Sequence, residues 1–106
     1  MRTGTANQQE LEQLSGLFRL LSDKTRLHIL LLLAAGERNV SSLCQELQLP
    51  QPTVSHHLGL LRMNNVIGNR RAGKQVFYTL NGQVGFRGDQ MCIPTEAYTV
   101  QIAPNA

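Results

Sequence analysis

Polar side chains suited to hydrogen-bond recognition gather at the start of one amphipathic segment, residues 51–64. These residues can all donate or accept hydrogen bonds through their side chains: Gln51, Thr53, Ser55 and His56. Behind them, Val54, Leu58 and Leu61 recur at three- and four-residue steps, which predicts a helix with one buried stripe. Side chains near the N-terminus of such a helix can reach base edges in the major groove of DNA. The segment therefore predicts a DNA-reading helix, with Arg62 as a cation near its end.

A basic β-hairpin is predicted directly after this helix, over residues 66–80. Val76, Tyr78 and Leu80 alternate with the residues between them, which is the period of a β-strand. The predicted turn comprises Arg70, Arg71, Ala72, Gly73 and Lys74. Gly73 can adopt the positive φ that tight hairpins require. The cations of such a hairpin would contact DNA phosphates, which adds affinity but little sequence information.

The charges of the chain are unevenly distributed. The net charge is +3, but no acidic residue occurs between Leu47 and Gly88, where five basic residues contribute +5. The remainder carries five basic and seven acidic residues, a balance of −2. This segregation is typical of a face that binds a polyanion. A merely solvated basic surface is the alternative, and the adjacent hairpin favours the polyanion-binding face.

Helices are expected ahead of this unit. The first begins at Gln8, and its apolar residues would pack on the domain or on a second copy. These apolar residues are Leu11, Leu14, Leu17, Phe18 and Leu21. The second helix, residues 23–35, is expected to be capped by Ser22. Residues 29–35 are apolar all round, so this helix should be buried on most sides.

A short third helix ending near Leu47 would be capped by Ser41 or Ser42. Residues 48–50 then form the turn that leads into the reading helix, which is the spacing of a helix-turn-helix. The predicted fold is mainly α with a small β-hairpin (α+β). It is a winged helix-turn-helix with about four helices and a two- or three-stranded wing.

Three regions are predicted: a flexible N-terminal arm (1–7), the winged helix-turn-helix DNA-binding domain (8–82) and an atypical tail (83–106). In the tail, glycines and prolines interrupt any long helix. Tyr98 and Ile102 belong to an alternating pattern that suggests a short strand.

Several classes of protein are disfavoured by the sequence. The first ten residues lack the apolar core of a signal peptide, and the longest apolar run, 29–35, is too short to span a bilayer. We find no nucleophile–base pair, carboxylate pair or phosphate-cradling glycine loop, so we expect no enzyme. Two cysteines are too few for a secreted disulfide scaffold. We expect a cytoplasmic protein without a membrane partner.

Four segments resemble the ArsR/SmtB family of bacterial winged-helix repressors: LSDKTRLHILLLL, VSSLCQEL, QPTVSHHLGLLR and RRAGKQVFYTL. The resemblance covers roughly residues 14–81. It implies a homodimer that binds a double-stranded DNA operator and leaves it when an inducer binds. It places the recognition helix at residues 51–64 and the wing at residues 66–80. The positions matching the DNA contacts of the family are Gln51, Thr53, Ser55 and His56, with Arg70, Arg71 and Lys74 on the wing.

The end of the chain departs from this family. Members usually bury their first and last helices together at the dimer interface, whereas Gly88 and Pro94 interrupt the corresponding stretch here. Either the first helix carries more of the contact, or the tail pairs as strands. Residues 83–106 are therefore a candidate part of the dimer interface.

The metal ligands of the family are largely missing. Arsenic-type members use three thiolates in a C-V-C-x-x-C arrangement, and the equivalent run 39–44 retains only Cys44. Zinc-type members use carboxylates and histidines on a long last helix, and no histidine follows Asn81. We expect no metal and no cofactor, and the inducer stays unidentified.

Two alternatives stay open. Cys44 and Cys92 could form a redox sensor, although the cysteine sensors of the family lie on the second and last helices; structural thiols are the favoured interpretation. The whole domain could also be a winged-helix protein–protein interaction module without DNA binding. The acid-free basic stretch argues against that module.

Overall fold

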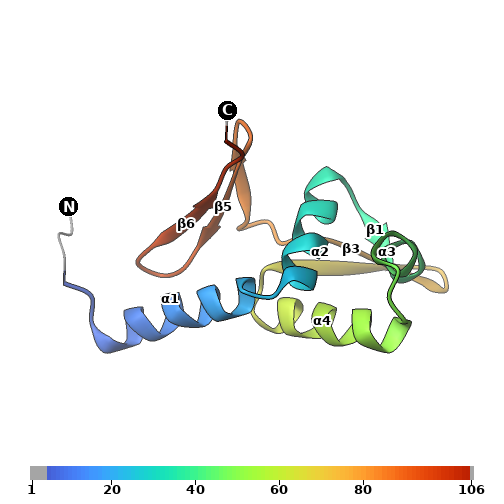
Figure 1. Ribbon diagram of the computed structural model, residues 1–106, viewed down its shortest axis with the longest axis horizontal. Coiled ribbons are helices and arrows are strands. Elements are labelled where there is room, and N and C mark those ends of the chain that lie inside the picture. The colour runs from blue at the N-terminus through green and yellow to red at the C-terminus, as the bar shows by residue number, and fades with distance from the viewer. Residues whose placement is uncertain (1–4, 106) are drawn as a thin grey trace.

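The computed structural model describes residues 5–105 and contains four helices and two three-stranded antiparallel sheets (Figure 1). The helices are α1 (Gln8–Leu21), α2 (Lys24–Ala35), α3 (Val40–Leu47) and α4 (Gln51–Met63). The first sheet contains β1 (Arg38–Asn39), β2 (Ile67–Ala72) and β3 (Gln75–Leu80). The second contains β4 (Gly85–Arg87), β5 (Gln90–Pro94) and β6 (Thr99–Ile102). The predicted winged helix-turn-helix is confirmed, with α3 and α4 as its two helices and the first sheet as its wing.

The N-terminus of α1 is fixed by a capping box. The Asn7 side chain accepts a hydrogen bond from the Glu10 amide at 2.8 Å, and the Glu10 carboxylate accepts one from the Asn7 amide at 3.0 Å. Of the predicted arm, residues 1–4 lie outside the described part of the chain. Residues 5–7 are not helical.

Two predicted helix caps were wrong. Ser22 does not cap α2; it ends α1 in a helical conformation, with φ −75° and ψ −7°. Asp23 has the extended backbone that an N-cap needs, and its carboxylate accepts from the Arg26 amide at 3.0 Å. In the same way Asn39, rather than a serine, caps α3 by accepting from the Ser42 amide at 2.8 Å.

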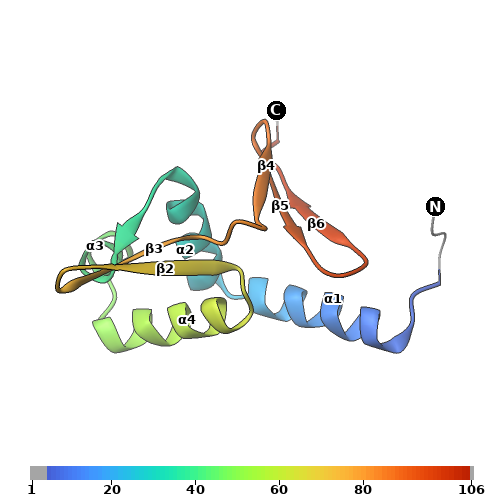
Figure 2. The same ribbon diagram turned by 180° about the vertical axis from the view of Figure 1, so that it is seen from behind.

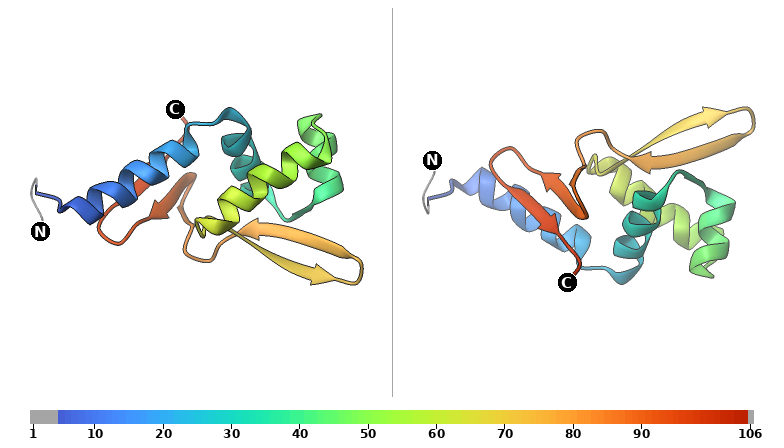
Figure 3. Two further views of the ribbon diagram at one scale, coloured as in Figure 1. Left: turned by 90° about the horizontal axis from the view of Figure 1, so that it is seen from below. Right: turned by 90° about the horizontal axis from the view of Figure 1, so that it is seen from above.

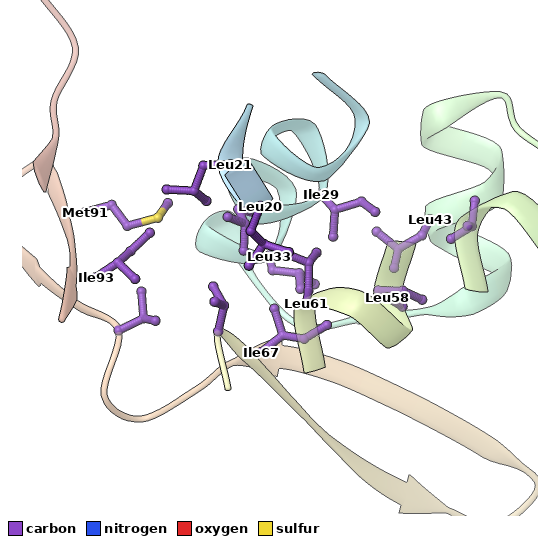
Figure 4. Packing of buried hydrophobic residues seen from close by; sticks show 14 residues of the cluster. Leu20, Leu21, Ile29, Leu33, Leu43, Leu58, Leu61, Ile67, Met91 and Ile93 are labelled. Atoms are coloured by element: carbon purple, nitrogen blue, oxygen red, sulfur yellow. The ribbon is translucent and has the colours of Figure 1, made fainter. Parts of the chain in front are cut away.

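One aliphatic core joins the helices to both sheets (Figure 4). The predicted stripe of α4 is confirmed, because Val54, Leu58 and Leu61 are all buried. The prediction that α2 is buried on most sides is confirmed, because Ile29, Leu30 and Leu33 are buried, and Leu31, 57% exposed, lies on its one open side. None of the helices in the described part is both long and apolar enough to cross a membrane.

The wing has the strand order β1-β3-β2, and its long hairpin projects from the helices (Figure 2). Ala72 pairs with Gln75, so the turn consists of only Gly73 and Lys74, and Gly73 has the predicted positive φ of 63°. The predicted five-residue turn was therefore too long. Arg70 and Arg71 lie on strand β2, and their side chains leave opposite faces of the wing.

The tail folds into an antiparallel sheet of its own, beside α1 (Figure 3). The expected strand at its end is β6, whereas β4 and β5 were not predicted. The register pairs Met91 with Ile102 and Ile93 with Val100, which places these four apolar side chains on one face. Met91 and Ile93 are buried and join the same core as Leu20 and Leu21 of α1 (Figure 4).

Candidate nucleic-acid interface

The polar N-terminal half of α4 is exposed. The side chains of Gln51, Thr53 and Ser55 face solvent, and within residues 5–105 none of them makes a hydrogen bond. The buried stripe of α4 fixes this outcome, because apolar packing of one side of the helix turns the other side outward. Unpartnered donors and acceptors on a convex helix are available to a ligand, as the base-reading prediction requires.

His56 lies at the centre of the exposed face. At about 100° per residue, it stands opposite the buried stripe and shares an outward line with Gly59 and Met63. A Cβ added at Gly59 would meet no atom within 4 Å. No side chain protrudes at Gly59 in the middle of this face, which allows a wall of a DNA groove to approach the helix closely. Gly59 was not among the predicted site residues.

The N-terminus of α4 leaves amide groups free for an anion. Pro50 precedes the helix and provides no side-chain cap, and Pro52 lies in the first turn. The first turn of a helix has unpaired N–H groups and the positive end of the helix dipole. A phosphate of the DNA backbone could bind at this end while the side chains reach the bases.

The wing cations have different environments. Arg71 and Lys74 are exposed and form no ion pair within the described residues, and the same is true of Arg62 at the other end of α4. Arg70, in contrast, donates to both carboxylate oxygens of Glu37, at 2.7 and 2.8 Å. Its guanidinium also lies 4.9 Å from the centre of the Phe77 ring.

The pairing of Arg70 with Glu37 changes both pKa values. The hydrogen bonds from Arg70 hold the pKa of the Glu37 carboxyl below its ordinary value, and the same bonds raise the pKa of Arg70. Glu37 lies in the turn between α2 and β1, 33 residues from Arg70 along the chain. No local sequence signal marks this contact.

The two cysteines are free thiols on separate parts of the molecule. Cys44 lies on α3 and Cys92 on β5, and α2 stands between these elements in Figures 1 and 2. Both thiols are partly buried, and Cys44 packs against the core. Among the described residues, no group of three or more His, Cys, Asp or Glu side chains is placed to hold a metal ion.

Residues 23–67 match the family model described as "Bacterial regulatory protein, arsR family". The arsenical resistance operon repressor of Escherichia coli is 45% identical over 69 residues, which is 64% of this chain and 59% of that protein. The regulator KmtR of Mycobacterium tuberculosis is 41% identical over 62% of this chain and 51% of its own length. The transcriptional repressor SdpR of Bacillus subtilis is 34% identical over 67% of this chain and 79% of its own length.

Solved structures show the same fold. HlyU from Vibrio cholerae superimposes with a TM-score of 0.67 at 30% identity, covering 72% of this chain and 83% of that one. The winged helix-turn-helix domain of Mb0332 from Mycobacterium bovis, described as homodimeric, gives a TM-score of 0.65 at 29% identity over 76% of this chain and 77% of that one. The match thus spans only 59% of the E. coli repressor and 51% of KmtR.

Proposed function

Since this chain belongs to the ArsR family of bacterial regulatory proteins, we propose that it is a homodimeric, sequence-specific transcriptional repressor that an inducer releases from a double-stranded DNA operator. The observation that carries this proposal is the exposed, unpartnered polar face of α4 beside the cations of the wing. The relatives named as repressors support the direction of regulation. They also favour DNA binding over a protein–protein interaction module. The proposal includes no catalysis and places the protein in the cytoplasm, where its operator would be.

Base contacts and phosphate contacts are assigned to different side chains. Gln51, Thr53, Ser55 and His56 contact base edges in this proposal. The remaining contacts are to phosphates, and the cations that make them are Arg62, Arg70, Arg71 and Lys74. A dimer would offer two such sets, so affinity would fall steeply with salt.

Arsenical sensing is not part of the proposal. The description of the E. coli relative names arsenical resistance, but the run equivalent to a three-thiolate site retains only Cys44 in this chain. Three soft ligands hold a thiophilic ion in such a site, and one thiol cannot replace them. The proposal therefore names no inducer.

The apolar flank of α1 is the proposed seam of the homodimer. Leu11 and Phe18 are 49% and 54% exposed, and Leu14 lies between them at the three- and four-residue steps of a helix-pairing seam. An unpartnered seam of this kind is stabilised when a second copy covers it. The homodimeric description of the Mb0332 domain supports the same assembly. Residues 83–106 stay a candidate part of the interface, because their sheet stands beside α1 (Figure 3).

Fluorescence anisotropy with the promoter of the chain's own operon tests the DNA-binding proposal. We expect the wild-type protein to prefer this DNA over a scrambled duplex of equal length. Replacing Ser55 and His56 with Ala should reduce the preference by about 1–3 kcal/mol for each lost base contact.

The matched control for that variant changes Ser41 and His28 to Ala, since both are exposed and lie on other helices. Unchanged discrimination in the Ser55/His56 variant would move the reading surface away from α4. Equal binding of both duplexes by the wild-type protein would refute sequence-specific binding.

A further inference from the structure

A partly buried polar contact joins the recognition helix to the rest of the domain. Arg26, on α2, donates from Nε to the Leu20 carbonyl at 2.7 Å, and its Nη1 lies 3.2 Å from Nδ1 of His57 on α4. Leu20 lies in the last turn of α1, whose carbonyls have no partner within the helix. One guanidinium therefore ties the end of α1 to the side of α4.

The chemistry of arginine selects one tautomer of the neutral His57 ring. A guanidinium can only donate, so Nδ1 of His57 must accept, and the ring proton of the neutral imidazole is on Nε2. Asp23 is the other charged group facing the ring, but its carboxylate oxygen is 3.9 Å from Nδ1, too far for a hydrogen bond. Arg26 is therefore the hydrogen-bond partner of the ring.

This contact is the polar part of an otherwise apolar surface on which α4 packs. Among the described residues, His57 is the only residue of α4 whose side chain hydrogen-bonds to another element. The remaining packing of α4 is aliphatic, and hydrophobic burial is non-directional. The buried stripe sets which side of α4 faces outward, and a directional hydrogen bond at one side of the helix restricts its rotation about the axis further. The His57 side chain is only 13% exposed, so water competes weakly for this bond.

The fixed ring also supports a base-reading residue. The His56 ring meets the His57 ring edge-on, with centroids 5.6 Å apart and an angle of 63° between the planes. His56 is exposed at the centre of the proposed reading face. A chain of contacts thus runs from the Leu20 carbonyl through Arg26 and His57 to His56.

We propose that Arg26 and His57 are positioning residues for DNA recognition, which hold the reading face of α4 at the angle that the major groove requires. The proposal rests on the DNA binding proposed above. His57 itself contacts no DNA in this arrangement. Loss of the contact should impair sequence discrimination more than overall charge-driven binding, because the phosphate-contacting cations are unchanged.

The key comparison is between His57→Leu and His57→Asn. The Asn carbonyl oxygen can accept from Arg26 as Nδ1 does, whereas Leu fills the space without an acceptor. At a temperature where thermal unfolding shows every variant to be folded, we expect His57→Leu to bind the promoter duplex about tenfold more weakly. The bound angle of α4 must then be reached without a hydrogen bond to a charged group, whose strength is of this order. Binding to scrambled DNA should stay the same. His57→Asn should restore most of the affinity.

Two further variants complete the test. Arg26→Met should resemble His57→Leu, and the double variant should be no weaker than either single variant, because both remove one contact. His28→Leu is the matched control, since His28 is an exposed histidine on α2. Full discrimination by His57→Leu, or equal loss in His57→Leu and His57→Asn, would overturn the positioning role.

Imidazole ¹⁵N NMR of the free protein separates this proposal from the DNA-binding proposal. We expect the Nε2–H tautomer for His57 in the wild-type protein and a mixture of tautomers in Arg26→Met. A wild-type Nδ1–H tautomer would overturn the contact itself, whatever the DNA results. Absence of any DNA preference in the wild-type protein, with the Nε2–H tautomer present, would refute the proposed function instead.

Discussion

Arg70 and Arg71 are neighbours in the chain but differ in what competes for their charge. Arg71 has no ion-pair partner within the described residues, so a DNA phosphate would be its first. Replacing Arg71 with Ala should weaken binding to all DNA sequences alike and lower the salt slope by about 0.9 per protomer–phosphate contact. Titrations at several salt concentrations measure this slope. Lys24→Ala, an exposed cation on α2, is the control and should leave the slope unchanged.

In the proposed complex, Glu37 would compete with phosphate for Arg70. The ion pair is bidentate, but the Arg70 and Glu37 side chains are 57% and 30% exposed, and pairs at such sites contribute little to stability. Replacing Glu37 with Gln should therefore release Arg70 and raise affinity for every duplex, with a salt slope steeper by up to about 0.9.

Glu46→Gln is the control for that change, since Glu46 pairs with Arg38 of β1 and not with a cation of the hairpin strands. Weaker binding by Glu37→Gln would contradict the phosphate role of Arg70. It would show instead that the ion pair is needed to hold the wing in place.

The exposure of residues could be predicted where it depends on local pattern, and contacts between residues far apart in the chain could not. The exposure of Gln51 and Ser55 follows from the apolar stripe on the same helix. The pairing of Arg70 with Glu37 joins residues 33 positions apart, and that of Arg26 with His57 joins residues 31 apart. Nothing in a one-dimensional pattern distinguishes a free wing arginine from a paired one.

At the scale of elements, the cap of α2 makes stability depend on pH. The backbone hydrogen bond from Arg26 is the main cause that holds the pKa of Asp23 below its ordinary value. At pH values near and between the folded and unfolded pKa of Asp23, the unfolded chain then binds more protons than the folded chain. The free energy of unfolding therefore falls as the pH falls through this range. Replacing Asp23 with Asn keeps a good cap but removes this titration.

Urea unfolding between about pH 5 and pH 3 should therefore show a smaller loss of stability for Asp23→Asn than for the wild-type protein. Asp23→Ala should cost about 1 kcal/mol at neutral pH, because the cap itself is lost. Asp89→Asn changes an exposed carboxylate in the β4–β5 turn and serves as the control. An unchanged pH dependence in Asp23→Asn would show that other carboxylates dominate.

Elements with strong periodicity were predictable, and their ends were less so. The buried stripe of α4 and the alternation of β3 identified both halves of the winged unit. Ser22 and Asp23 are adjacent good caps, and only the extended backbone at Asp23 decides between them. In the tail, β4 is only three residues long, and in β5 the residue between Met91 and Ile93 is the apolar Cys92, so neither strand shows a clear alternation. Met91 and Ile93 of this sheet join the core that contains Leu20 and Leu21 of α1, which is a tertiary effect.

At the scale of the molecule, the reading unit and the proposed dimer seam occupy different ends. The molecule is elongated, with principal extents of 47, 31 and 24 Å, and α1 with the C-terminal sheet lies at the end away from the wing tip (Figure 1). In a symmetric dimer built on α1, both copies of α4 would lie outside the seam. Such a dimer can bind two half-sites, as pseudo-palindromic operators require.

Replacing Phe18 with Glu should therefore disrupt the dimer and leave the fold of each protomer intact. The Phe18 side chain is 54% exposed in one chain, so the change should cost the monomer fold little, whereas a charge in a dimer seam has no partner. Light scattering should show a monomer at concentrations where the wild-type protein is a dimer. Promoter affinity should fall about tenfold or more, because a monomer lacks the second half-site contact.

Leu31→Glu gives the matched comparison for Phe18→Glu, since Leu31 is 57% exposed and belongs to α2, not to the α1 seam. This variant should remain a dimer with unchanged promoter binding. A dimeric Phe18→Glu protein would show that α1 is not the seam. The exposed edges of the C-terminal sheet would then be the next surface to test, because an unpaired strand such as β6 can join the same strand of a second copy across a two-fold axis.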